Sequence, residues 1–208
     1  MVVRWYAAVL PRFAHGILLD LGCGKAPYYS LYAPLVQSIL CTDWAHSLHG
    51  DEYLDFVSDF DNYLPLVDEC VDTIIMSDVL EHVYRPQQVL NETYRLLRPG
   101  GVAVINTPFM YPVHEAPHDY YRYTQYAMKR MVEDAGFIVE VLDPLGSKLI
   151  ALAEITGKIL QGIAPVFALL AAGLQRGAVA LSGRLPRTQK FPTFIGTVIR
   201  KPPVPTGR

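Results

Sequence analysis

The sequence predicts a doubly wound α/β domain, and three observations lead to this prediction. Short apolar runs alternate along the chain with longer segments of helical pattern. The first apolar run ends at a glycine-rich turn. Acidic residues follow the ends of the next runs, at the edge where such a sheet binds its ligands. With 208 residues, the chain can bury one sizeable core.

Uninterrupted apolar runs are expected to be strands that are covered on both faces, because such strands need no polar alternation. The four clearest runs are 16–22, 38–43, 71–78 and 100–109, and two later strands are expected at 137–142 and 193–201. Helices are predicted at 27–36, 86–98 and 124–137, the last with Thr124 as its N-cap and Gly136 as its stop. Strands that alternate with helices in this way indicate a doubly wound sheet.

Residues 145–185 depart from this alternation because they are almost wholly apolar. One predicted helical face carries Leu149, Leu152, Ala153, Ile159, Leu160 and Ile163, and the other carries Glu154, Lys158 and Gln161. Pro165 then interrupts the pattern and can begin a second helix. We therefore predict a helical hairpin inserted into a domain formed by 1–144 and 186–201, with 202–208 as a disordered tail.

The overall composition narrows the classes of partner. The net charge is −2 and no basic block is present, so we expect no nucleic-acid partner. The apolar fraction of 51% is high, which indicates that some apolar surface meets a partner or a membrane. Three cysteines without C-x-x-C spacing and an N-terminus without an export pattern predict a cytoplasmic protein, with peripheral membrane contact as an option.

The segment "LLDLGCGKA" joins a predicted strand to a predicted helix. Gly22 and Gly24 let the backbone approach a ligand, but the third glycine of a dinucleotide fingerprint is absent. Asp20 lies beside this turn, where a carboxylate would repel a pyrophosphate and attract an ammonium group. The turn therefore favours a nucleoside-like ligand that carries an amine.

Two further acidic residues follow strand ends. Asp43 ends the second strand about 20 residues after the glycine turn, where a carboxylate can bind two ribose hydroxyls. Trp44 could lie against a purine, and Asp59 could accept a hydrogen bond from an exocyclic amine. The alternative interpretation is that each aspartate is only a polar strand end.

In combination these motifs resemble class I S-adenosylmethionine-dependent methyltransferases, in the small bacterial branch that includes the quinone-ring methyltransferases. The resemblance rests on "LLDLGCG", "CTDW", "SDFDNYLP", "VDTIIMSDVLEHV" and "RLLRPGGVAVINTPF", and covers about 16–142 and 191–201. Lys25 and Ala26 depart from it, because a small residue and then glycine are usual there. It implies a seven-stranded Rossmann-like sheet in the order 3-2-1-4-5-7-6, with an antiparallel last strand.

The resemblance also assigns expected roles to individual residues. Asp20 would reach the amine of S-adenosylmethionine, and Ser77 and Asp78 would border its sulfonium. The remaining contacts would come from the glycine turn, the ribose site and the adenine site: Gly22, Cys23, Gly24, Asp43, Trp44, Asp59 and Phe60. Glu81 and His82 follow, and the structural alternative is that they cap the next helix and pin a loop.

The segment His114-Glu115-Ala116-Pro117-His118 matches the H-E-x-x-H pattern of zinc proteases. Pro117 disfavours the helix which that zinc site needs, so we expect a loop without a metal. The loop leaves the ligand-binding edge, where His114 or His118 could act as a catalytic base. The alternative is that Asp119, Tyr121 and Arg122 form a purely structural network.

We therefore expect a methyltransferase that acts on a small or lipid-linked acceptor. Two alternatives stay open, namely a Rossmann-type oxidoreductase and a non-catalytic scaffold that retains the cofactor. The apolar run between Lys158 and Gln175 is shorter than the roughly 20 residues that a membrane span needs. Three roles for the hairpin remain: extra core, a surface that contacts a membrane, or a homodimer interface with Gly173 and Gly177 at the contact. We expect one of the last two, so that the hairpin is an association surface.

Overall fold

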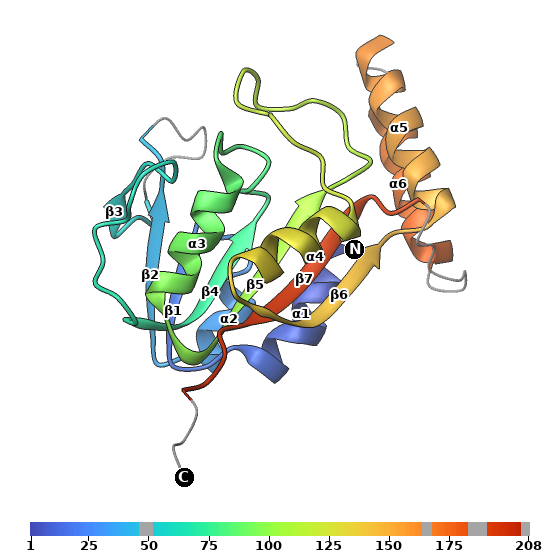
Figure 1. Ribbon diagram of the computed structural model, residues 1–208. Helices are drawn as coiled ribbons and strands as arrows, with labels where there is room; N and C mark the ends of the chain where they lie inside the picture. The colour runs from blue at the N-terminus through green and yellow to red at the C-terminus, as the bar shows by residue number, and fades with distance from the viewer. Residues whose placement is uncertain (46–51, 164–167, 183–190, 205–208) are drawn as a thin grey trace.

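The computed structural model describes residues 1–45, 52–163, 168–182 and 191–204, and these residues form a seven-stranded sheet with helices on both faces (Figure 1). The strands are β1 Ile17–Leu21, β2 Ser38–Asp43, β3 Phe56–Val57, β4 Val71–Ser77, β5 Leu97–Pro108, β6 Ile138–Leu145 and β7 Phe194–Arg200. Their order is β3-β2-β1-β4-β5-β7-β6, with β7 antiparallel to both neighbours and the other pairs parallel. The predicted fold class and strand order are confirmed.

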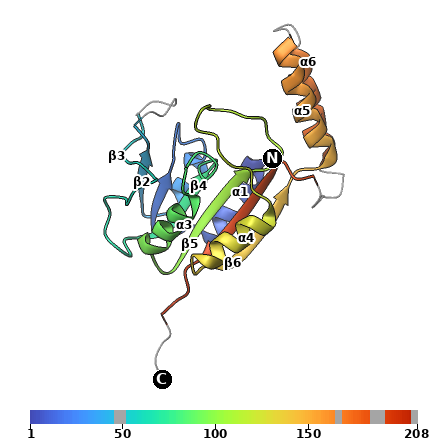
Figure 2. The same cartoon turned by 45° about the horizontal axis from the view of Figure 1, so that its top comes forward.

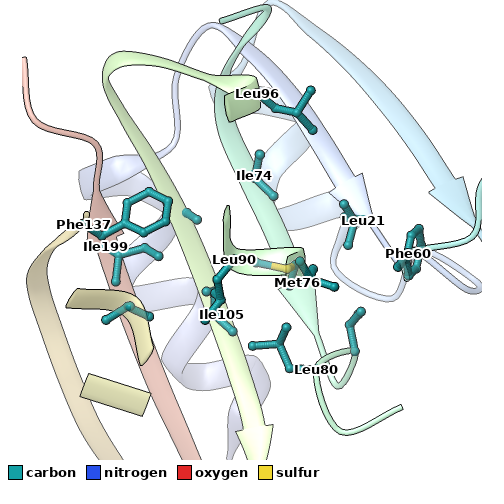
Figure 3. Close-up of a cluster of buried hydrophobic side chains, with 14 of the residues drawn as sticks. Leu21, Phe60, Ile74, Met76, Leu80, Leu90, Leu96, Ile105, Phe137 and Ile199 are labelled. Atoms are coloured by element: carbon teal, nitrogen blue, oxygen red, sulfur yellow. The ribbon is translucent and has the colours of Figure 1, made fainter. Parts of the chain in front are cut away.

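Alternate side chains of the central strands enter two separate cores. Ile74 and Met76 of β4 pack beneath α3 (Pro86–Leu96), in a cluster that also lies under α4 (Gln125–Asp134) (Figure 3). Ile75 points to the opposite face, into a cluster formed with α1 (Val2–Phe13) and α2 (Tyr29–Tyr32). Both faces of the sheet are therefore covered, which is why its strands are uninterrupted apolar runs.

Helix boundaries follow local chemistry. The Thr124 hydroxyl accepts a hydrogen bond from the backbone N–H of Ala127 at 3.1 Å, so the predicted N-cap is confirmed. After α4, Gly136 has a φ of +93° and ends the helix as expected. The helix predicted at 27–36 is shorter, because Pro34 lacks a backbone donor and the chain continues as a 3-10 turn, η1 (Ala33–Leu35).

The sequence analysis assigned no element to the first residues, whereas the structure forms α1 there. Trp5, Tyr6, Val9 and Leu10 of this helix are buried against the sheet. A side chain at Gly196 of β7 would lie 2.5 Å from the Trp5 ring, so glycine is needed at this contact. The sequence does contain a signal for this helix, because Trp5, Tyr6, Val9 and Leu10 are spaced as residues on one helical face.

Two helices lie between β6 and β7, α5 (Lys148–Ile163) and α6 (Ala168–Ser182), and they stand away from the sheet (Figures 1 and 2). Small residues are buried where they pack, including Ala151, Ala153 and Ala178. On the predicted apolar face of α5, Ala153 is buried, whereas Leu152 and Ile159 are exposed.

Some predictions for the insertion and for the tail lie outside what the structure describes. In the insertion these concern Pro165, 183–185 and the side chains of Glu154, Lys158, Leu160, Gln161 and Ile163; in the tail they concern residues 205–208. Within the described ranges, none of the helices combines the length and the apolar character that crossing a bilayer requires.

Candidate functional site

A cavity of about 1010 Å³ opens at the carboxyl ends of β1, β2 and β4, where the sheet order reverses direction. Every residue that the sequence analysis selected contributes to its wall. These residues are Asp20, Gly22, Cys23, Gly24, Asp43, Trp44, Asp59, Phe60, Ser77, Asp78, His114 and His118. The cavity therefore brings together the ends of four strands and the loop after β5.

The glycine turn after β1 lies close against its neighbours. Gly22 has a φ of +77°, and a Cβ on it would lie 2.4 Å from Cγ2 of Val79. The backbone N–H groups of Gly22 and Cys23 donate to the carbonyl of Thr42 at 2.8 and 3.1 Å. Ala26, which stands where glycine is usual in the resembled family, also has a positive φ, +45°. The turn thus keeps a glycine-like backbone despite the departure in sequence.

Asp20 lies buried at the end of β1, beneath this turn. The hydroxyl of Tyr32 donates to its carboxylate at 2.6 Å. Burial raises the pKa of Asp20 to about 6, because the charged form has lost its water. A cationic group in the cavity would stabilise that charged form, which suits the ammonium ligand expected here.

Asp43 is buried at the end of β2 and holds the glycine turn in place. Its carboxylate accepts hydrogen bonds from the backbone N–H groups of Gly24 at 3.1 Å and Trp44 at 2.8 Å. Sequence reasoning anticipated only a ligand role for Asp43. The structure adds that this side chain links the second strand end to the first.

The segment after β3 forms another part of the wall. Asp59 is exposed and accepts hydrogen bonds from the N–H of Asp61 and the side-chain amide of Asn62. Phe60 is buried against the core. The buried hydroxyl of Ser58 has no hydrogen-bond partner within the described part of the chain, so a ligand in the cavity could satisfy it.

Ser77 ends β4 and Asp78 follows it, with a φ of +55°, a strained value for a residue with a side chain. Its carboxylate accepts from the Asn106 amide at 2.8 Å and the Ser77 hydroxyl at 3.4 Å. The Tyr6 hydroxyl donates to the side-chain Oδ1 of Asn106 at 2.7 Å. Burial raises the pKa of Asp78 to about 6. Sequence reasoning missed Tyr6 and Asn106, which orient Asp78 from beneath.

The H-E-x-x-H segment lies in a loop, as predicted, and Glu115 has a φ of +52°. Its two histidines have different partners. The ring of His118 lies edge-on to Trp44, with centroids 4.9 Å apart, and its Nδ1 is 3.0 Å from the Tyr120 hydroxyl. Nε2 of His114 is instead 3.2 Å from Nε2 of His82. The geometry is not that of a zinc-protease helix.

The loop is fixed by the structural network that the sequence analysis gave as an alternative. Arg122 forms two hydrogen bonds with the buried carboxylate of Asp119, at 2.6 and 2.7 Å. Burial alone would raise the pKa of Asp119, but the hydrogen bonds from Arg122 lower it to about 2. The hydroxyls of Tyr121 and Tyr123 donate to carbonyls of Tyr84 and Leu80. This network holds the loop against the segment after β4.

Glu81 and His82 belong to that segment. Nδ1 of His82 is 2.8 Å from the carbonyl oxygen of His118, so His82 pins the loop as proposed. The capping expectation was wrong, because α3 begins at Pro86 with Arg85 as its N-cap. Glu81 is fully buried, and burial raises the pKa of its carboxyl group well above the usual value. Burial lowers the pKa of His114.

Comparison with known proteins finds similarity to methyltransferases. Residues 19–105 match the family model described as a methyltransferase domain. A "probable S-adenosylmethionine-dependent methyltransferase" of Mycolicibacterium smegmatis is 29% identical over 158 residues, which are 69% of this chain and 61% of that protein. These similarities support a methyltransferase domain of the class I S-adenosylmethionine-dependent type over residues 19–105. The cofactor named for this relative is the one that the sequence resemblance implied.

Two other similarities place this methyltransferase more broadly. The malonyl-[acyl-carrier protein] O-methyltransferase of Pectobacterium atrosepticum is 30% identical over 108 residues, 48% of this chain and 42% of that protein. The solved structure of the [4+2]-cyclase SpnF has a TM-score of 0.65 at 18% identity, covering 98% of this chain and 80% of that one. The chain spans about three fifths or less of the length of these curated relatives.

The cavity fits S-adenosylmethionine on structural grounds as well. Asp20 offers a buried carboxylate that a cation would stabilise, and Ser58 offers a hydroxyl without a hydrogen-bond partner among the described residues. The glycine turn leaves no room for a side chain at Gly22. These three features suit a ligand that carries both an ammonium group and polar ring atoms.

Proposed function

We propose that this protein transfers the methyl group of S-adenosylmethionine to a small or lipid-linked acceptor. The proposal rests on the set of residues that line the cavity. The glycine turn and acidic strand ends lie on one side, and a histidine-bearing loop lies on the other. Such an arrangement allows one part of the cavity to hold the cofactor and another to orient the acceptor.

On the cofactor side, Asp20 would bind the ammonium group and the backbone of Gly22, Cys23 and Gly24 would follow the methionine and ribose part. Asp43 would accept hydrogen bonds from the ribose hydroxyls, in addition to those from the backbone N–H groups of Gly24 and Trp44. Phe60, Trp44, Ser58 and Asp59 would surround the adenine, and Ser77 and Asp78 would border the sulfonium. The bound cofactor supplies an electrophilic methyl group, and its in-line displacement depends above all on orientation.

On the acceptor side, His114 and His118 are the candidate bases. An acceptor hydroxyl or thiol must lose a proton as the methyl group is transferred, and a neutral imidazole can take it. The lowered pKa of His114 keeps its ring neutral at neutral pH. Both histidines line the cavity, which supports this role.

The hairpin formed by α5 and α6 supports a lipid-linked acceptor. β6 runs parallel to β5, because both are antiparallel to β7, so α5 leaves the same edge of the sheet as the cavity. The hairpin exposes a series of large apolar side chains: Leu152, Ile155, Ile159, Leu170, Leu174 and Leu181. We infer that it is an association surface that holds the protein at a membrane and brings an apolar acceptor to the cavity.

A homodimer through the same hairpin is the other outcome to test. Gly173 and Gly177 are both exposed, and no described atom lies within 4 Å of a Cβ built on either residue. A second copy could therefore approach this side of α6 closely.

The proposal is tested by titrating the full chain with S-adenosylmethionine and S-adenosylhomocysteine in a calorimeter, and then by following transfer of a labelled methyl group. The acceptor panel should contain hydroxyl, amine and thiol compounds, each in soluble form and in lipid vesicles. We expect stoichiometric binding of both cofactor forms and transfer to a vesicle-borne acceptor. Failure to bind either form would contradict the proposal, and binding without transfer across the panel would favour a scaffold.

A further inference from the structure

Two histidine rings face each other on the wall of the cavity. His82 follows β4 and His114 lies in the loop after β5, 32 residues further along the chain. Their Nε2 atoms are 3.2 Å apart, and the rings meet edge-on at 78°. This contact joins the two segments that border the acceptor side of the cavity.

The other nitrogen of each ring already has an acceptor. Nδ1 of His82 is 2.8 Å from the carbonyl oxygen of His118. Nδ1 of His114 is 3.3 Å from the carbonyl oxygen of Pro112 and 3.3 Å from a carboxylate oxygen of Asp119. Carbonyl and carboxylate oxygens only accept, so each Nδ1 carries the hydrogen. In a neutral imidazole the Nε2 atom then carries a lone pair and no hydrogen, and the two Nε2 atoms are 3.2 Å apart.

Two lone pairs at this distance repel unless a proton or a metal cation lies between them. The side chain of Glu81 supplies a third ligand atom at the same point. It is fully buried, and neither of its carboxylate oxygens has a hydrogen-bond partner among the residues described. One of these oxygens is 3.9 Å from Nε2 of His82. Ligand atoms of all three residues lie within 4.8 Å of one another.

We propose that Glu81, His82 and His114 bind a divalent transition-metal ion of the zinc type. Zn²⁺ is bound by imidazole nitrogens and carboxylate oxygens, with metal–nitrogen distances of about 2.0–2.1 Å. In a tetrahedral site these distances place two nitrogens about 3.3 Å apart, which agrees with the observed 3.2 Å. The ion would neutralise the buried carboxylate and occupy the space between the lone pairs.

The surroundings of the two rings match those of metal-bound histidines. Such histidines donate their second N–H to a carboxylate or a backbone carbonyl, which fixes the tautomer and the ring orientation. The Pro112 carbonyl serves His114 in this way, with the carboxylate of Asp119 also 3.3 Å from the same nitrogen, and the His118 carbonyl serves His82. Asp119 is itself held by Arg122. The loop that contains His114 is therefore positioned by groups that a metal site needs.

The three proposed metal ligands are not those of the H-E-x-x-H pattern. Only His114 belongs to both sets. His118 contributes its backbone carbonyl, and its ring contacts Trp44 and Tyr120 instead. With Nε2 of His114 on the metal, the role of base in the proposed reaction passes to His118.

Three protein ligands leave a coordination position open, and His82 and His114 both line the cavity. On the proposed function, an oxygen atom of the acceptor would take that position, and the metal would lower its pKa. This last consequence rests on methyl transfer, whereas the binding of the metal does not.

The experiment measures metal binding without cofactor or acceptor, so its outcome is independent of the proposed reaction. The full chain is stripped with a chelator and titrated with Zn²⁺ against a chromophoric competitor, and with Co²⁺ followed by its visible absorption. We expect one equivalent of either metal per chain. His82→Ala, His114→Ala and the isosteric Glu81→Gln should each weaken binding by at least about 100-fold, and Asp119→Asn by roughly 10- to 100-fold.

His15→Ala is the matched control, because His15 is exposed and its ring contacts only the carbonyl of Phe13 among the interactions that the structure shows. Its metal affinity should equal that of the parent chain. Thermal melting of every variant verifies folding, and the stoichiometry of the unmodified chain is a test that needs no variant. Failure of the unmodified chain to take up one equivalent would overturn the proposal. Equal metal uptake by a folded His82→Ala/His114→Ala double variant would do the same.

Discussion

The two sides of the cavity are built in different ways. On the cofactor side, the acidic residues lie at or next to strand ends, and backbone N–H groups of Gly24 and Trp44 hold Asp43. On the acceptor side, the contacts join segments that are distant in sequence, such as His82 with His114 and Leu80 with Tyr123. The cofactor side is thus determined by short motifs and the sheet, whereas the acceptor side depends on how one loop docks.

The largest effect is expected on the cofactor side. Asp43→Ala would remove the two proposed hydrogen bonds to ribose and release the glycine turn, so the affinity for S-adenosylmethionine should fall by about 2–4 kcal/mol, roughly 30- to 1000-fold. Calorimetry on the variant measures this loss. Asp134→Ala, at the exposed end of α4, should keep the parent affinity. An unchanged affinity in Asp43→Ala would remove the basis for the ribose assignment.

On the acceptor side, removing a single hydroxyl group breaks one of the hydrogen bonds that hold the loop in place. Tyr123→Phe leaves the buried carbonyl of Leu80 without its hydrogen-bond donor, which should lower the free energy of unfolding by about 1–3 kcal/mol. Tyr126→Phe is the control, since Tyr126 is 75% exposed and Tyr123 only 3%. Denaturant unfolding compares the two. If the comparison of the two sides is right, cofactor affinity stays nearly constant in Tyr123→Phe, and a marked loss would argue against it.

The pH dependence of cofactor binding should report Asp20. Its pKa of about 6 in the folded protein exceeds the usual 3.8, so the folded cofactor-free protein binds this proton more tightly than the unfolded chain. This group therefore lowers stability as the pH rises from about 4 to 6. Binding of an ammonium group requires the carboxylate, so affinity should fall about tenfold for each pH unit below 6.

The pKa of Asp78 is also about 6, so a pH dependence of cofactor affinity could come from either Asp20 or Asp78. Calorimetry between pH 5 and 7 on Asp20→Asn distinguishes the two, because this variant should bind weakly with little pH dependence. A slope that persists in Asp20→Asn would point to Asp78 instead.

The smallest effect on stability is expected in the hairpin. Leu170 and Leu174 are 60% and 49% exposed, so replacing both with Glu should change the unfolding free energy by only about 0.5 kcal/mol at each site. Liposome flotation should nevertheless fall sharply, and light scattering shows whether a dimer is lost instead. Tyr126→Glu adds a charge elsewhere on the surface as a control. A large loss of stability, with a parent chain that is monomeric and does not float, would show that the hairpin is core.

The sequence by itself determined the sheet and one side of its cavity. Apolar runs without polar alternation identified the main strands, and the glycine turn, Asp20, Asp43 and Asp59 identified the binding edge, because parallel strands bring their carboxyl ends to one place. These features are local, so their chemistry can be inferred from neighbours in the chain.

Only the tertiary structure decided which distant side chains meet. It placed His114 against His82 and not beside His118, and it buried Glu81 without a hydrogen-bond partner in the described part of the chain. It also brought Tyr6 of α1 beneath Asn106 and turned Leu152 and Ile159 outward on α5. The physical reason is that a helical or loop pattern shows which residues share a face but not what packs against that face.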